Sequence, residues 1–143
     1  MNTNTTASAN VALVQQLYTL FGQGNIPAIL DELGSEMEWH GMGAPLLTYA
    51  GDYRGAAIGQ FFQGMAQALD ITEFVPLDFV ERGEDVIAFG LIGGTARDTN
   101  QPFRSKWIMH WRFQDGRPCY FQDYVDTANL FAATTAAAQP AGL

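Results

Sequence analysis

The second half of the chain is an almost unbroken succession of strand-like segments, and this feature constrains the fold most. Beyond Asp70 the segments are "FVPLDFVERG", "DVIAFGLIGGTA", "PFRSKWIMHWRF" and "PCYFQDYVD". They are separated by turn-forming residues, "GED", "RDTNQP" and "QDGR". Connections this short favour antiparallel pairing of consecutive strands. The sequence therefore predicts an antiparallel sheet.

The first half has helical periodicity instead. Apolar residues recur at helical spacing over residues 11–21, and glycines end this helix. A second helix, capped by Asn25, runs to about residue 33, and a third spans residues 55–69. Between these two, "GSEMEWHG" is a short extended segment that enters a long loop rich in Gly, Pro and Tyr. We expect an α+β fold, with three N-terminal helices packed over a curved antiparallel sheet.

The chain of 143 residues fits one domain, which we place at residues 10–132. Residues 1–9 are rich in Thr and Asn and are predicted to be a disordered N-terminus. Residues 133–143 are rich in Ala and are predicted to be a flexible tail.

Charge and composition exclude several classes of function. A net charge of −8 argues against nucleic acid and against an anionic membrane surface as partners. No signal peptide and no long apolar segment is present in the sequence, so we expect a cytoplasmic protein. Cys119 is the only cysteine, which excludes an intrachain disulfide and a zinc site built on thiolates. We predict no metal and no cofactor.

Alternation along the strands sorts side chains by face of the sheet. In "FRSKWIMHWRF", Trp107 and Met109 share the apolar parity, so we expect them to face the helices. His110 has the opposite parity and belongs to a basic outer face, where solvent or a partner subunit would meet it. In the last strand, Asp123 shares its parity with Phe121, which places an acid on an apolar inner face. Such an acid is either a structural anchor or part of a site.

The stretch "MEWHGMGAP" contains one of the two histidines, His40, between an aromatic residue and a glycine. His40 either bonds a nearby backbone carbonyl where a strand meets a loop, or it projects into a cavity. The sequence leaves both alternatives open.

Several segments resemble the superfamily of nuclear transport factor 2, ketosteroid isomerase and the SnoaL-like polyketide cyclases. They are "VQQLYTLFGQGNIPAILDEL", "YAGDYRGAAIGQFF" and "WRFQDGR…FQDYVD", and the resemblance covers about residues 10–132. It implies a cone in which helices close over a curved sheet around a deep apolar pocket. It also implies a homodimer formed through the outer face of the sheet.

The family's functional positions match this chain only in part. The general base of ketosteroid isomerase falls at or beside His40. Its oxyanion-hole tyrosine falls on Leu17, with Tyr18 next along, and its protonated aspartate falls on Met109. That oxyanion hole is therefore absent, and steroid isomerisation by that mechanism is not expected.

The chain is also similar to limonene-epoxide hydrolase at the last strand, where a catalytic aspartate matches Asp123. The water-binding tyrosine and asparagine of that enzyme fall on Glu38 and His40. Its arginine and second aspartate fall on Gly90 and Ile92, so the epoxide mechanism loses its proton donor.

The resemblance implies a pocket protein, and we expect an isomerase, cyclase or hydrolase acting on a small apolar, oxygenated molecule such as a polyketide, terpenoid or steroid. His40 would be the general base and Asp123 its orienting acid, with Glu38 as the alternative carboxylate. Possible oxyanion donors are Tyr18, Tyr49 and Tyr53, and the expected lining includes Trp107, Met109 and Phe121. A non-catalytic binding protein and a dimerisation domain of the same fold remain alternatives.

Overall fold

The computed structural model describes residues 8–135. Its elements are α1 (Ala9–Gly22), α2 (Ile26–Leu33), β1 (Glu38–Gly41), β2 (Gly51–Arg54), the 3-10 turn η2 (Gly55–Ala57), α3 (Ile58–Ala68), β3 (Leu69–Arg82), β4 (Asp85–Ala96), β5 (Pro102–Gln114), β6 (Arg117–Val125) and α4 (Thr127–Thr135).

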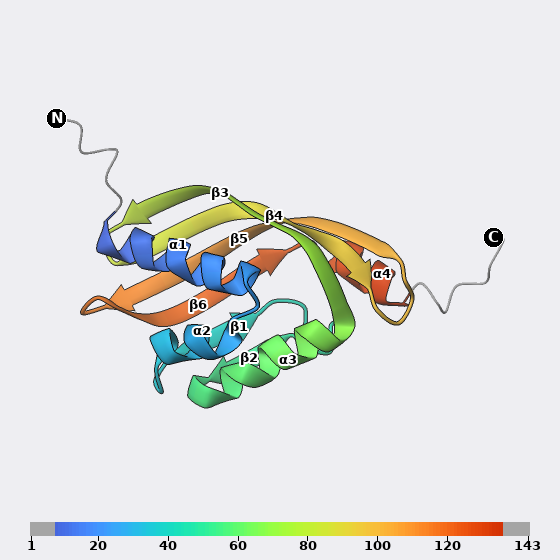
Figure 1. The fold of residues 1–143 in the computed structure, drawn as a ribbon, viewed down its shortest axis with the longest axis horizontal. Coiled ribbons are helices and arrows are strands. Elements are labelled where there is room, and N and C mark those ends of the chain that lie inside the picture. Colours follow the sequence, from blue (N-terminus) through green and yellow to red (C-terminus); the bar gives the residue numbers. More distant parts are fainter. Residues whose placement is uncertain (1–7, 136–143) are drawn as a thin grey trace.

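The strands form one six-stranded sheet in the order β2-β1-β6-β5-β4-β3. Neighbouring strands pair antiparallel except β1 and β6, which are parallel. Figure 1 shows α1, α2 and α3 covering one face of this sheet, with β3 and β4 bending along its length. The predicted α+β fold is confirmed, with two additions: the parallel pair, and β2 inside the segment expected to be a loop.

A fourth helix, α4, follows the last strand and lies against β5 and β4. Asp126 caps it, because its Oδ1 accepts a hydrogen bond of 3.0 Å from the backbone N–H of Asn129. Residues 133–135, predicted as the start of a flexible tail, belong to this helix. At the other end Ser8 caps α1, so the helix begins at Ala9. The rest of the two predicted flexible ends, residues 1–7 and 136–143, lies outside the described residues.

The core lies between the helices and the inner face of the sheet and is dominated by aromatic side chains. As the alternation predicted, Trp107, Trp111 and Phe121 are buried on this face. Gly90 makes room for Trp107, since a Cβ at this position would lie 2.2 Å from Trp107 Cζ2. Gly55 has a φ of +57°, and a Cβ there would lie 2.4 Å from a backbone oxygen, which explains a glycine before α3.

Within the described residues, no helix is long and apolar enough to cross a membrane.

Candidate functional site

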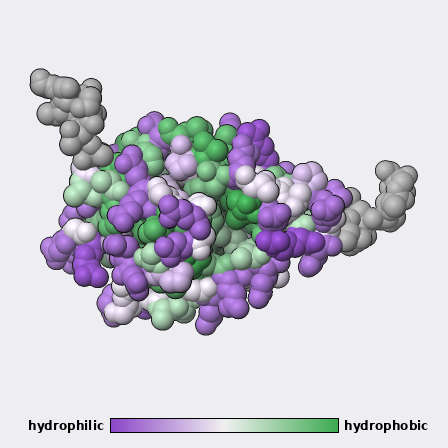
Figure 2. Space-filling model, in the orientation of Figure 1, coloured by the Kyte–Doolittle hydropathy of each residue, from purple (hydrophilic) through white to green (hydrophobic). Residues whose placement is uncertain are grey.

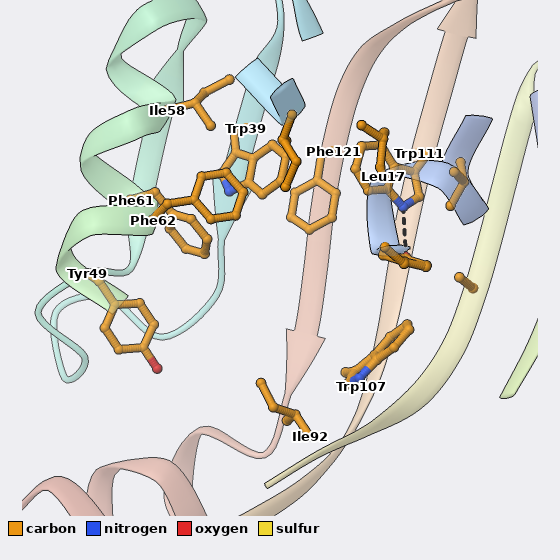
Figure 3. Close-up of a cluster of buried hydrophobic side chains, with 14 of the residues drawn as sticks. Leu17, Trp39, Tyr49, Ile58, Phe61, Phe62, Ile92, Trp107, Trp111 and Phe121 are labelled. Atoms are coloured by element: carbon orange, nitrogen blue, oxygen red, sulfur yellow. Dashed lines mark hydrogen bonds between the residues drawn. The ribbon is translucent and has the colours of Figure 1, made fainter. Parts of the chain in front are cut away.

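A cavity lies between the helices and the inner face of the sheet. The cavity has a volume of about 70 Å³. A single water needs a cavity of roughly 10–15 Å³, so this one has room for several waters or a small ligand. Most of the lining is apolar: Leu17, Phe21, Ile29, Trp39, Met42, Phe61, Phe62, Met65, Leu69, Phe74, Ile92, Trp107, Met109, Trp111, Phe121, Val125 and Leu130. Figure 3 shows part of this aromatic wall, and Figure 2 shows apolar surface between hydrophilic margins on one face of the molecule.

Asp123 is the carboxylic acid of the cavity. It lies on the inner face of β6, as its parity predicted, and only 9% of the residue is exposed. Its Oδ1 accepts a hydrogen bond of 2.7 Å from the backbone N–H of Met42. No other residue among those described bonds its second oxygen. Burial raises the pKa of Asp123 to about 6, against the opposing effects of the Met42 N–H and of its own backbone N–H, so this acid titrates close to neutral pH.

Tyr18 brings a hydroxyl to the cavity from α1. This hydroxyl accepts a hydrogen bond of 3.0 Å from the indole Nε1–H of Trp111, drawn as the dashed line in Figure 3. It donates in turn to the thioether sulfur of Met109, at 3.2 Å. A thioether is a weak acceptor, so an oxygen of a ligand could replace it. Burial raises the pKa of Tyr18, and the charge of Asp123 adds to this effect.

Tyr49 lies in the loop between β1 and β2 and also lines the cavity. Its hydroxyl oxygen points into the space that faces Trp107 and Ile92 in Figure 3. Burial raises the pKa of Tyr49, and Asp123 again contributes through its charge. Both tyrosines are therefore within electrostatic reach of the same carboxyl group.

His40 is not part of the cavity, and its expected pairing with Asp123 is wrong. Trp39 and His40 alternate along β1, and Trp39 takes the inner face. His40 Nδ1 lies 2.7 Å from Asp52 Oδ1, and its Nε2 lies 3.0 Å from Glu38 Oε2. The alternative carboxylate, Glu38, is likewise absent from the lining. Hydrogen bonding to Asp52, and less so to Glu38, raises the pKa of His40.

Some of the remaining candidate residues line the cavity and others do not. Trp107, Met109 and Phe121 line the cavity. Tyr53 does not, because its hydroxyl donates a hydrogen bond of 2.7 Å to the backbone carbonyl of Tyr49. His110 lies on the outer face, as its parity predicted, with its Nε2 2.9 Å from Asp85 Oδ1.

The described part of the chain contains no group of three or more His, Cys, Asp or Glu residues placed to hold a metal ion. Asp123 is the one acidic residue in the cavity lining formed by residues 8–135, and no histidine or cysteine accompanies it there.

The sequence matches a known domain family, and the fold matches solved structures. Residues 14–120 match the model of the SnoaL-like domain. An NTF2-like protein of unknown function from Burkholderia pseudomallei is 26% identical, with a TM-score of 0.82 over 90% of this chain and 99% of that one. TerC, co-crystallised with polyporic acid, is 24% identical, with a TM-score of 0.79 over 89% and 98% of the two chains. IdmH of Streptomyces antibioticus, a candidate polyketide cyclase, is 19% identical, with a TM-score of 0.69 over 87% and 96%.

No curated protein matches the sequence. The structural neighbours share the curved sheet and helices of this chain, which agrees with the family match. The chain belongs to the family of SnoaL-like domains and has the NTF2-like fold.

Proposed function

We propose that this chain is an enzyme in which Asp123 is the general acid and base for a small, largely apolar, oxygenated molecule. One observation carries the proposal: a carboxyl group is buried in an apolar cavity, with one oxygen held by the backbone N–H of Met42 and the other bonded by no other residue among those described. A group that titrates near pH 6 both accepts and returns a proton readily at neutral pH. This is the property that isomerisation and cyclisation through an enol require.

The chemistry follows from the arrangement of the groups. The free carboxylate oxygen of Asp123 would remove a proton from a carbon next to a carbonyl, or from a hydroxyl. Negative charge would then develop on the ligand oxygen, where a buried hydroxyl stabilises it. Tyr18 is one such donor, because the indole N–H of Trp111 already polarises its hydroxyl. Asp123 would return the proton at the new position.

His40 has no role in this proposal. Its ring nitrogens are occupied by Glu38 and Asp52, and it does not line the cavity. His40→Ala is therefore a matched control for Asp123→Asn.

The test is a screen for turnover with oxygenated polyketide, terpenoid and steroid-like compounds. TerC was co-crystallised with polyporic acid, which supports including this compound in the screen. We expect conversion by the native chain and by His40→Ala, a loss of at least about 100-fold in Asp123→Asn, and a rate that depends on a group titrating near pH 6. Equal rates in the native chain and Asp123→Asn would refute the proposal. Binding without turnover by any compound would favour the non-catalytic alternative.

We also propose that two copies associate through the outer face of the sheet. Ile108 and Tyr124 are neighbours in the register of β5 and β6, and they are 40% and 45% exposed. Phe89 pairs with Ile108 from β4, so apolar side chains from three adjacent strands meet on this face. Sedimentation should show a dimer that Ile108→Asp dissociates. A native chain that sediments as a monomer at micromolar concentration would contradict this.

A further inference from the structure

We propose that Tyr49 is a ligand-binding residue of the cavity and that it sets the class of ligand. Its hydroxyl would donate a hydrogen bond to a carbonyl oxygen of a compact aromatic molecule whose second oxygen faces Asp123. The inference rests on the proposed function only in placing a ligand in this cavity; it requires no turnover.

The hydroxyl of Tyr49 has no hydrogen-bond partner among the described residues. Tyr49 is only 7% exposed, yet no described residue bonds this hydroxyl. The hydroxyl oxygen is not among the fully enclosed, unpaired side-chain atoms of the described residues, so a small molecule in the cavity can reach it. In Figure 3 the oxygen points toward the side of Ile92 and Trp107, which line the cavity together with Tyr49. A ligand oxygen is the partner that this geometry lacks.

Tyr18 differs from Tyr49 in this respect. The hydroxyl of Tyr18 already accepts from Trp111 and donates to Met109. Of the two tyrosines, Tyr49 is the one whose hydroxyl has no hydrogen-bond partner among the described residues. A ligand that carries an acceptor oxygen would supply the partner that the hydroxyl of Tyr49 lacks among the described residues.

Tyr49 is held in place although it lies in a loop. The hydroxyl of Tyr53 donates to the backbone carbonyl of Tyr49 at 2.7 Å. The ring of Phe61 meets that of Tyr49 edge to face, with centroids 5.9 Å apart. A Cβ on Gly64 would lie only 3.1 Å from the Cβ of Tyr49, so the glycine lets this residue pack against α3. A donor fixed before the ligand arrives loses little entropy on binding. Tyr53 is thus a positioning residue.

The polar groups define the ligand class. Beside Asp123 and the two tyrosines, the lining is apolar and largely aromatic. A suitable ligand has an aromatic or similarly flat skeleton with two oxygen functions, a carbonyl for Tyr49 and a hydroxyl or enol for Asp123.

A pair of isosteric probes tests this assignment. 4-Hydroxyacetophenone carries a carbonyl and a hydroxyl on one ring, and 4-isopropyltoluene has the same shape without oxygen. Calorimetric titration of the native chain should give tighter binding of 4-hydroxyacetophenone. Tyr49→Phe should weaken that binding about tenfold, the worth of one hydrogen bond, and leave 4-isopropyltoluene unaffected. Tyr53→Phe should weaken it less, and Tyr120→Phe, on the outer face, should have no effect.

Three results would overturn the inference. The first is equal binding of the two probes, or no binding of either, by the native chain. The second is an unchanged affinity of Tyr49→Phe for 4-hydroxyacetophenone. The third is a Tyr49→Phe variant that melts well below the native chain, because the hydroxyl would then have a structural partner. Discrimination between the probes without turnover of any compound would leave this inference standing and count against the enzyme.

Discussion

Asp123→Asn should stabilise this protein at neutral pH, against the usual effect of replacing a buried polar residue. The pKa of Asp123 is raised from 3.8 to about 6 in the folded chain, chiefly by burial. The folded state therefore holds the proton more tightly than the unfolded state does. The contribution of Asp123 to the free energy of unfolding is therefore most favourable below its ordinary pKa of about 4. This contribution falls between about pH 4 and pH 6 and stays lower above that range.

The size of the effect follows from the shift. About two pKa units correspond to roughly 3 kcal/mol of stability that the native chain lacks above pH 6. An asparagine carries no charge, and its side-chain oxygen can still accept from the N–H of Met42. Its NH₂ group needs a partner in the cavity, which costs about 1 kcal/mol. The net gain at pH 8 is therefore expected to be about 1–3 kcal/mol.

The assay is urea unfolding of both chains at pH 4.5 and pH 8, with a thermal melt at each pH. The variant should exceed the native chain at pH 8, with a melting temperature higher by about 2–10 °C, and the difference should shrink or vanish at pH 4.5. Asp98→Asn, at an exposed position, is the matched control and should show no such pattern. A variant that is less stable than the native chain at both pH values would refute the reasoning.

The other predictions concern three further sites. His40→Ala should lower the melting temperature more at pH 5.5 than at pH 9. Hydrogen bonding to carboxylates raises the pKa of His40, so the charged imidazole stabilises the fold at low pH, and this stabilisation is lost as the pH rises through the raised pKa. An equal loss of melting temperature at both pH values would contradict this prediction. Gly90→Ala should lower the free energy of unfolding in urea by about 1–3 kcal/mol, because the new Cβ would clash with Trp107. Gly22→Ala is the control and should be nearly neutral, since nothing lies within 4 Å of a Cβ there. Equal effects of the two substitutions would exclude the clash. Tyr18→Phe should cost about 1–3 kcal/mol because it leaves the buried indole N–H of Trp111 without an acceptor, and an unchanged unfolding midpoint would show that this hydrogen bond does not matter.

The inner face of the sheet can be predicted from alternation alone. In β5 and β6 the parity of the residues places Trp107, Met109 and Phe121 toward the helices, together with the single acid among them, Asp123. These strands are long, so a one-residue error would turn a whole apolar set outward. The cost of burying a carboxylate then marks Asp123 as a position of interest from the sequence itself.

The expectation that His40 faces the cavity is wrong because β1 is too short for alternation to decide. The strand has four residues, and the family resemblance allows a shift of one position. Trp39 and His40 cannot both face the cavity, and burial favours the tryptophan. Glu38 shares the parity of His40 and lies 3.0 Å from it, so a charged residue two positions away is a usable signal that both face outward.

The position of Tyr49 at the cavity cannot be derived from sequence. The loop between β1 and β2 has no periodicity, and nothing in the sequence predicts the hydrogen bond that Tyr53 makes to the carbonyl of Tyr49. Gly64 and Phe61 of α3 pack against this residue, and such contacts between distant segments are not readable from the sequence. Three tyrosines are candidate donors by sequence, and only their tertiary contacts distinguish them.

The most direct test is the titration of the Asp123 carboxyl carbon by ¹³C NMR, assigned by comparison with Asp123→Asn. We expect a midpoint near pH 6 for the chain without ligand. A ligand that donates a hydrogen bond to the charged carboxylate should lower this midpoint. A midpoint near 4 would show a solvated carboxylate. It would remove the basis for acid–base chemistry by Asp123 in this cavity.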